Sequence, residues 1–114
     1  MTRLYKLLDR PAWEDAKAAG VFKGSAIDIA DGFIHFSTAG QTTETARRHF
    51  AGQDDLMLLA VDARALGAAL RWEPSRGGEL FPHLYAELPA SAVIEAHPLA
   101  LGPDGVPAIG ALEP

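Results

Sequence analysis

The chain has 114 residues, of which 48% are apolar and 22% are charged, a composition typical of one globular domain and not of a disordered chain. Fifteen acidic against ten basic residues give a net charge of −5, and no basic cluster is longer than Arg47-Arg48, which argues against general nucleic-acid binding. Cysteine is absent, which excludes disulfide scaffolds, zinc ribbons and cysteine nucleophiles.

Signals for membrane insertion and export are missing from the sequence as well. The longest apolar run, Leu56 to Val61, has six residues, whereas a membrane span needs roughly 18. The segment Met1 to Lys6 does not open the extended apolar region of a secretion signal. We therefore expect a cytoplasmic protein with no membrane partner, of undetermined oligomeric state.

The first third of the chain predicts a strand, a helix and a turn-rich connection. The strand covers Arg3 to Leu8. Asp9-Arg10-Pro11 has the pattern of a helix start, and Gly20 is a suitable helix stop. The connection, Val21 to Asp31, is expected to contain one short helical turn around Ser25 to Ile29.

A five-residue β-rich run begins at Phe33. Alternation along a strand places His35 and Ser37 on the same face as Phe33. The apolar Ile34 and Phe36 then point to the other face. This run therefore predicts a strand with one polar and one buried side.

The next predicted element is a helix. Thr38 and Gln41 match the capping box Thr-x-x-Gln, in which each residue's side chain bonds the other's backbone amide. The helix is expected to continue through Ala46 and Phe50 and to end at Gly52.

The middle of the chain predicts two strands and a short helix. Leu56 to Val61 lacks alternation, which indicates a strand buried on both faces. Asp62 is a candidate cap for a short helix through Leu66. Arg71-Trp72-Glu73 has the pattern of a further strand that Pro74 ends.

The last predicted strands are Phe81 to Tyr85 and Ala92 to His97. Within the first of these, Pro82 favours an edge, a strand start or a bulge over a central ladder position. The tail from Gly102 predicts a turn and a frayed end. About six strands and two or three helices, without regular alternation, indicate an α+β fold.

Two of these strands carry the residues with the most chemical potential. His35 and Ser37 share one strand face, and His83 and Tyr85 repeat that arrangement with a phenol in place of the serine. Each histidine alone fits a half-buried side chain bonded to a backbone carbonyl. Two such pairs in one small domain favour a shared ligand site, because buried polar groups need partners.

Three further side chains are candidates between these strands. Glu73 can orient an imidazole or a ribose hydroxyl, and Trp72 can stack on a planar ring. Arg76, in a glycine-containing loop, can reach a phosphate as a bidentate donor. The structural alternatives are an exposed acid beside a core tryptophan and a solvated loop arginine.

At these positions the chain resembles the Domain of Unknown Function 952 family. The resemblance runs from Leu4 to about Leu99. It rests on Gly32-Phe33-Ile34-His35-Phe36-Ser37-Thr38, Gln41, Ala46, Phe50, Trp72-Glu73 and Phe81-Pro82-His83-Leu84-Tyr85.

The resemblance implies a fold and a cleft but no established activity. The family is grouped by fold with ADP-ribosyltransferase-like proteins, which bind NAD between the two halves of a split antiparallel sheet. We therefore expect a split, mostly antiparallel sheet with two or three packed helices. A single domain would cover residues 1–114, with a loosely ordered tail from about residue 102.

One position departs from the family pattern. The family usually has histidine after the tyrosine of its first strand, whereas this chain has Lys6 after Tyr5. Lysine keeps a donor and a charge but loses the planar, two-sided hydrogen bonding of imidazole. The substitution weakens the expectation of NAD turnover.

The leading hypothesis is a transferase or hydrolase that acts on NAD or an ADP-ribose-like nucleotide, with no certain cofactor besides that ligand. The catalytic candidates are His35, His83 and Glu73, and the ligand-binding candidates are Lys6, Ser37, Trp72 and Tyr85. We expect the two histidines to line one cleft, with Tyr85 and Ser37 at its wall and Lys6 near its mouth.

Three alternatives stay open. A non-catalytic module would use the same cleft to hold a small ligand. A phosphoesterase is suggested by His35-x-Ser37, half of a two-histidine pattern whose second half fails at Tyr85. A metal hydrolase using His35, His83 and Glu73 is conceivable, but their spacing is not diagnostic of a metal site.

Overall fold

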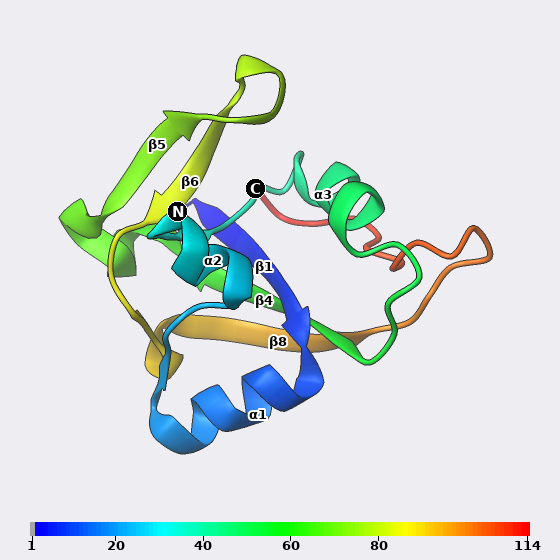
Figure 1. The fold of residues 1–114 in the computed structure, drawn as a ribbon, viewed down its shortest axis with the longest axis horizontal. Helices are drawn as coiled ribbons and strands as arrows, with labels where there is room; N and C mark the ends of the chain where they lie inside the picture. The colour runs from blue at the N-terminus through cyan, green and yellow to red at the C-terminus, as the bar shows by residue number, and fades with distance from the viewer. Residues whose placement is uncertain (1) are drawn as a thin grey trace.

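A computed structural model describes residues 2–114 as an α+β fold in which every strand pair is antiparallel (Figure 1). Sheet order is β1-β4-β8, β2-β7 and β3-β6-β5. The strands are β1 Arg3–Asp9, β2 Val21–Phe22, β3 Ile34–His35, β4 Leu56–Asp62, β5 Leu70–Pro74, β6 Leu80–Leu84, β7 Leu88–Pro89 and β8 Val93–Leu99. The helices are α1 Arg10–Ala19, α2 Ala26–Asp31 and α3 Thr42–His49, with short 3-10 helices at Ala63–Ala69, Arg76–Gly78 and Ala90–Ala92.

A single bridge joins the two larger sheets. Tyr5 of β1 pairs with Ser37, just beyond β3, through two backbone hydrogen bonds of 2.8 and 2.9 Å. The segment from Ile34 to Ser37 thus pairs with β6 at its start and with β1 at its end. The α+β class and the antiparallel pairing expected from the sequence are confirmed.

The β1-β4-β8 sheet has β4 at its centre. Leu59 and Val61 of this strand are fully buried, and the other residues from Leu56 to Ala60 are at most 7% exposed. Burial on both faces accounts for the unbroken apolar run, as the sequence predicts.

Helices α1 and α3 cover opposite faces of this sheet (Figure 1). On one face, Leu4, Leu8 and Leu59 pack with Trp13 of α1. On the other face, residues of β1 and β4 pack with Ala46 of α3 and with the C-terminal tail. Alternation along β1 therefore places Lys6 on the same face as Leu4, toward the first core.

Helix α1 begins and ends at the predicted signals. The Asp9 carboxylate accepts a 2.7 Å hydrogen bond from the amide of Ala12, and Pro11 lies in the first turn. Gly20 ends the helix with φ of 82°, a left-handed conformation that residues with a Cβ rarely adopt.

Helix α2 is the short helical turn expected near Ser25. Its third position is Asp28, whose carboxylate accepts a 2.8 Å bond from the Ser25 amide. Gly32 ends the helix, and the chain then enters β3.

Helix α3 begins later than predicted. It starts at Thr42, so Thr38 lies in the turn that precedes it and not at its cap. The Thr38 amide donates to Gln41 Oε1 at 3.0 Å, which is half of a capping box. The other half, a bond accepted by the Thr38 hydroxyl, is not among the hydrogen bonds of residues 2–114. The full capping box is therefore a wrong prediction.

Strands β5 and β6 form a hairpin that completes the second sheet with β3. Pro82 lies in β6, the middle strand, and not at the edge that its sequence favours. Its carbonyl accepts from the Phe36 amide at 3.0 Å, just past the end of the two-residue β3 ladder. A proline fits there because the side on which its N–H is missing faces the point where that ladder stops.

The C-terminal tail packs against the molecule. The turn expected near Gly102 is present, closed by a 2.8 Å bond from the Gly102 amide to the Val106 carbonyl. The tail then crosses the second face of the β1-β4-β8 sheet, and the Tyr5 hydroxyl donates to the Glu113 carbonyl at 2.6 Å. Where the sequence predicts a frayed end, the structure has a covering segment.

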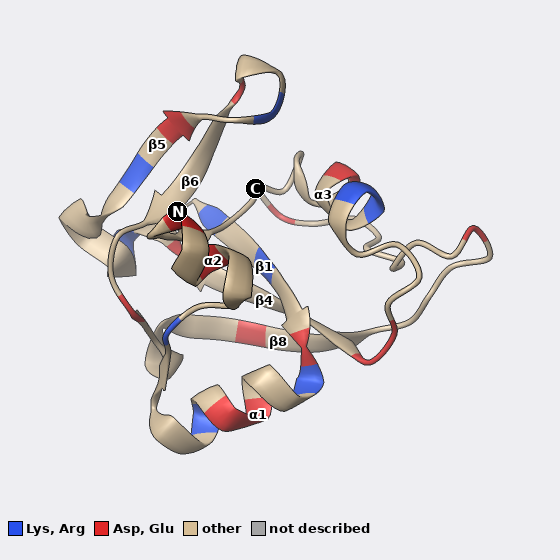
Figure 2. Ribbon diagram, viewed as in Figure 1, with Lys and Arg blue, Asp and Glu red and all other residues tan. Residues whose placement is uncertain are grey.

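The basic residues are spread over several elements, and the helices are short. Lysine and arginine are distributed over β1, α1, α3 and β5 without a continuous stripe in the view of Figure 2. Within residues 2–114, none of the helices has the length and apolar character required to cross a bilayer.

Candidate functional site

The candidate site lies on one face of the β3-β6-β5 sheet. Register places His35 of β3 directly opposite His83 of β6, and Arg71 of β5 opposite His83 on its other side. Opposite residues in an antiparallel ladder point to the same face, and so do residues two apart along a strand. Phe81, His83 and Tyr85 therefore share this face with Glu73.

Four rings meet at the centre of this face, and we call Phe33, His35, His83 and Tyr85 the ring cluster. The His35 and His83 ring centroids are 5.6 Å apart. Phe33 stacks on His83 at 4.0 Å and lies 4.6 Å from His35 and 5.2 Å from Tyr85. The two rings lie close together, as expected, but neither histidine lines the pocket described below.

Glu73 orients His83. Its Oε1 lies 2.9 Å from Nδ1 of His83 and accepts a 2.7 Å bond from the Tyr85 hydroxyl. The hydrogen bonds from Tyr85 and His83 hold the pKa of the Glu73 carboxyl below its usual value. The bond between Tyr85 and Glu73 also raises the pKa of the Tyr85 hydroxyl. An ionised Glu73 places the proton on Nδ1, which leaves the lone pair on Nε2.

Nε2 of His83 is therefore the basic atom of the cluster. Among residues 2–114, no hydrogen-bond partner of this nitrogen is present, although the His83 residue is only 5% exposed. A carboxylate-oriented imidazole with a free Nε2 is the arrangement of a general base.

His35 has a different environment. Its Nδ1 lies 2.6 Å from Asp28 Oδ1 and its Nε2 lies 2.9 Å from Asp31 Oδ2. The ring can donate to both carboxylates only when each nitrogen carries a proton. Both nitrogens of His35 therefore face carboxylate oxygens, whereas in His83 only Nδ1 does.

Asp28 connects His35 to a buried cation. Its two oxygens lie 3.1 and 3.0 Å from Nζ of Lys6, and the two residues are 2% and 7% exposed. Burial raises the pKa of the Asp28 carboxyl, but the bond from His35 and the charge of Lys6 outweigh it and hold the pKa well below its usual value. Burial lowers the pKa of Lys6, which the charge of Asp28 offsets only in part.

The expected position of Lys6, near the mouth of a ligand cleft, is therefore wrong. Lys6 does not lie near the mouth of a cleft, because strand alternation turns its side chain toward the first core. There it is enclosed and bound to Asp28. Lys6, which stands where the family resemblance implied a histidine, thus forms a buried ion pair with Asp28, the residue that bonds His35.

Ser37 and Trp72 also lie apart from the ring cluster. The Ser37 hydroxyl is 2.9 Å from that of Thr45 in α3, so it does not pair with His35. Trp72 is opposite Pro82 in the register and points to the other face of the hairpin, where it is 43% exposed. The geometry thus gives no support to a His35-x-Ser37 phosphoesterase pair.

A pocket of about 300 Å³ lies beside the ring cluster. Phe33 and Tyr85 line it, together with Asp28, Lys23 and Glu87. Tyr85 was expected at such a wall, whereas Ser37 does not line this pocket. The pocket is large enough for part of a small ligand.

The sequence analysis missed Asp28, Asp31 and Phe33 as site residues. Phe33 was already assigned to the same strand face as His35, and an aromatic ring on that face was a usable signal. Ser25-x-x-Asp28 matches a helix-start pattern that places Asp28 at α2. No sequence pattern indicates that Asp28 would meet Lys6, which is 22 positions away.

Comparison with known proteins agrees with this arrangement of elements. Residues 7–96 match the family described as "Protein of unknown function (DUF952)". The chain belongs to the DUF952 family. Both histidines of the ring cluster lie within the matched residues, whereas the C-terminal tail lies outside them.

Solved structures of one bacterial protein are similar to this DUF952 chain. The crystal structure of protein CC0527 from Caulobacter crescentus is 54% identical and has a TM-score of 0.94, with 96% of each chain covered. The solution NMR structure of CC0527 is 55% identical with a TM-score of 0.87, covering 96% of this chain and 95% of that one. A comparison with curated proteins found no significant match.

Proposed function

We propose that the ring cluster binds NAD or an ADP-ribose-like nucleotide, and that His83 acts as the general base in transfer or hydrolysis of the ADP-ribosyl group. The observation that carries this proposal is the Glu73–His83 pair, with Nδ1 bound at 2.9 Å and Nε2 unpaired among the described residues. A binding surface alone has no need for a carboxylate that fixes one tautomer of the imidazole.

The chemistry suits one basic nitrogen next to stacking rings. Water or an acceptor hydroxyl forms a bond to the ribose carbon, and nicotinamide leaves with the electrons of the broken carbon–nitrogen bond. The proton of the attacking oxygen passes to Nε2 of His83. Phe33 and Tyr85, 5.2 Å apart, provide ring faces that can hold the nicotinamide or adenine.

The fold supports the same class of ligand. The two antiparallel sheets joined at the Tyr5–Ser37 bridge fit the split sheet of ADP-ribosyltransferase-like proteins, to which the sequence resemblance pointed. In this proposal His35 is the second catalytic candidate, and its Nε2 can bond a ligand once the exposed Asp31 side chain moves away from it. Lys6 is a positioning residue that acts on His35 through Asp28.

A ligand-binding module without turnover is the second candidate function. It is favoured by the position of Phe33, whose ring covers His83 at 4.0 Å. If Phe33 stays in place when a ligand binds, the face of the His83 ring on which it stacks is closed to the ligand. The ligand would then be held by the outer rings and released unchanged.

The test combines calorimetry with a nicotinamide-release assay. We expect wild-type protein to bind NAD and ADP-ribose and to release nicotinamide from NAD. His83→Gln and Glu73→Gln should each lower the release rate at least tenfold and change NAD binding little. His97→Gln is a matched control, because His97 is also bonded to a glutamate, Glu95, at 2.8 Å, but on the exposed strand β8.

The outcomes separate the two candidates. Release that depends on His83 but not on His97 supports the enzyme, and binding without release supports the module. The nucleotide proposal is overturned if neither NAD nor ADP-ribose binds to the wild-type protein.

A further inference from the structure

Two arginines differ from the rest of the chain in their partners. The sequence has seven arginines, and five of them form ion pairs with carboxylates. Among residues 2–114, no carboxylate lies within 4.0 Å of Arg71 or Arg76. Both belong to the β5–β6 hairpin, where Arg76 stacks on the Phe81 ring of β6 and Arg71 on the ring of Tyr85, which directly follows β6.

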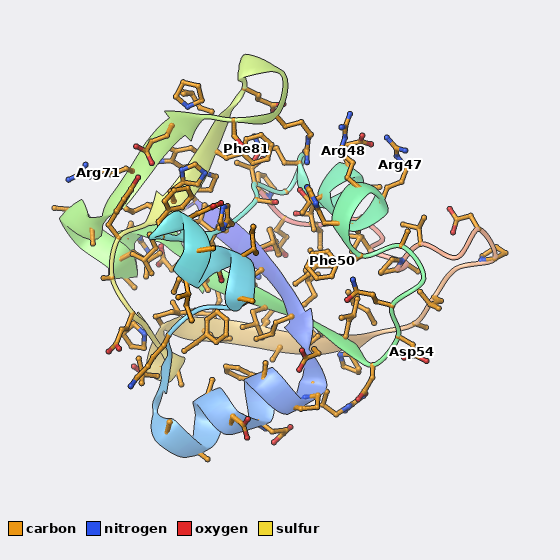
Figure 3. All side chains as sticks on the ribbon, in the orientation of Figure 1. Arg47, Arg48, Phe50, Asp54, Arg71 and Phe81 are labelled. Atoms are coloured by element: carbon orange, nitrogen blue, oxygen red, sulfur yellow. The ribbon has the colours of Figure 1, made fainter. Side chains whose placement is uncertain are left out.

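Arg76 and Arg71 mark opposite ends of the ring face. Arg76 lies over Phe81 with 4.7 Å between the guanidinium carbon and the ring centroid. Arg71 lies over Tyr85 at 4.9 Å. Phe81 lies between β6 and α3, whereas Arg71 extends outward from β5 (Figure 3). Arg76 therefore lies at the end of the face where the hairpin meets α3.

Two aliphatic hydroxyl groups lie at the Arg76 end. Nη1 of Arg76 donates to Oγ1 of Thr45 at 3.3 Å, and that oxygen is 2.9 Å from the hydroxyl of Ser37. The Thr45 hydroxyl itself donates to the Gln41 carbonyl at 3.0 Å. The Ser37 proton is the one that can turn to an incoming oxygen.

Glu79, three residues after Arg76, is engaged elsewhere. Glu79 accepts a 3.1 Å bond from the Gln41 side-chain amide. Arg76 is half-buried, so part of its hydration is lost without an opposite charge in return. A planar guanidinium fixed by ring stacking, next to two hydroxyls, matches the shape and charge of a phosphoryl group.

We propose that Arg76 and the Ser37 hydroxyl, both held by the Thr45 oxygen, bind a phosphoryl group. The position fits the ligand class proposed above, because Phe81 and His83 are two residues apart and so about 7 Å apart along the strand. A nucleotide whose phosphate binds at Arg76 has its ribose at the level of His83. As part of a nucleotide site the inference rests on the proposed function, whereas free phosphate or pyrophosphate would bind by the same chemistry.

The first experiment uses inorganic pyrophosphate as the probe. Titration into isotope-labelled protein is expected to shift the NMR signals of the Arg76 side-chain Nε–H and of the Ser37 and Thr45 amides. Arg76→Gln should weaken pyrophosphate binding at least tenfold. Arg71→Gln is the matched control, since Arg71 is also stacked and without an ion pair, and it should leave the affinity unchanged within twofold.

The second experiment repeats calorimetry with ADP-ribose on the same two variants. If ADP-ribose fails to bind but pyrophosphate binds through Arg76, the phosphoryl site stands and the nucleotide function falls. If ADP-ribose binds equally well to wild type and Arg76→Gln, the nucleotide function stands and the phosphoryl site is overturned. The phosphoryl site is also overturned if Arg76→Gln and Arg71→Gln lose pyrophosphate affinity equally. It is overturned as well if pyrophosphate leaves the NMR signals of Ser37 and Thr45 unshifted. Circular dichroism and the Arg76→Lys variant, which keeps the charge but not the fork, control for folding.

Discussion

Asp28 joins more of the candidate site than any histidine does. One carboxylate contacts the Lys6 ammonium, the His35 ring and the amides of Ser25 and His35. These contacts tie β1, α2 and β3 together at a buried point. The orientation of His35 is therefore coupled to the stability of the fold around it.

The two partners of the buried pair should differ in what their loss costs. Asp28→Asn leaves the buried Lys6 without a counter-charge, and we expect it to lower the free energy of unfolding by about 3–5 kcal/mol. Lys6→Met leaves Asp28 with His35 and two backbone donors, and we expect a smaller loss of about 1–2 kcal/mol. Urea denaturation measures both values. Equal losses of unfolding free energy in the two variants would contradict the conclusion that Asp28 joins these contacts.

The depressed pKa of Asp28 also predicts a pH dependence. An unfolded aspartate titrates near 3.9, and the folded carboxyl titrates well below that. Between the two values the unfolded chain binds the extra proton, so this stabilisation is complete at pH values above the unfolded pKa and is lost as the pH falls toward the folded one. Denaturation between about pH 2 and 6 should show a shallower acid-side loss for Asp28→Asn than for wild type, whereas parallel curves would contradict it.

Only part of the candidate site could be predicted from the sequence. Alternation along two short strands was enough to place His35 and His83 on faces that meet, because a strand has only two faces. The partners of those rings were harder to find. Glu73 was identified from its strand, but Asp28 comes from a six-residue helix whose direction depends on packing and not on periodicity.

At the scale of elements, Gln41 replaces the helix cap expected at Thr38. Its side chain accepts from the Thr38 amide and donates to Glu79 and to the Leu80 carbonyl. It thus connects the turn before α3 with the start of β6. The sequence located the correct pair of residues, but the helix starts only after the turn that they close.

These contacts invert the expected ranking of two alanine substitutions. Gln41→Ala removes three hydrogen bonds of a side chain in a residue that is 5% exposed, and we expect a loss of about 1–3 kcal/mol. Thr38→Ala removes a hydroxyl that has no bond among residues 2–114, and we expect about 0.5 kcal/mol or less. Thermal unfolding of the two variants gives the comparison. A larger loss of stability in Thr38→Ala than in Gln41→Ala would indicate that the Thr38 hydroxyl caps the helix after all.

At the scale of the whole molecule, the C-terminal tail completes the second core. Val106, Ile109 and Leu112 pack on the sheet face that also carries Tyr5 and Leu58. The sequence did not predict this cover, because glycine and proline make the tail resemble a free end. Its apolar residues are too widely spaced to indicate a strand or a helix.

Removal of the tail should therefore destabilise the fold. We expect Ile109→Ala with Leu112→Ala to lower the free energy of unfolding by about 2–3 kcal/mol, since both side chains are half-buried. A chain that ends at residue 105 should in addition bind an apolar dye through the exposed sheet face. NMR signals of His35 and His83 should stay in place in the double variant. An unchanged free energy of unfolding would show that the contacts of the tail with the sheet do not stabilise the fold.

The same tail brings the two ends of the described chain together. Glu113 lies 3.4 Å from Arg3 through their side chains and bonds Tyr5 through its carbonyl. A short glycine-rich linker from residue 114 to residue 2 can therefore close the polypeptide, with new ends cut between Gln53 and Asp54. We expect this circular permutant to have the circular dichroism spectrum of the original chain and to unfold cooperatively. Loss of that spectrum would contradict this expectation. In such a molecule β4 would be the first strand synthesised and β1 would follow β8, although the order of strands in the sheet would be unchanged.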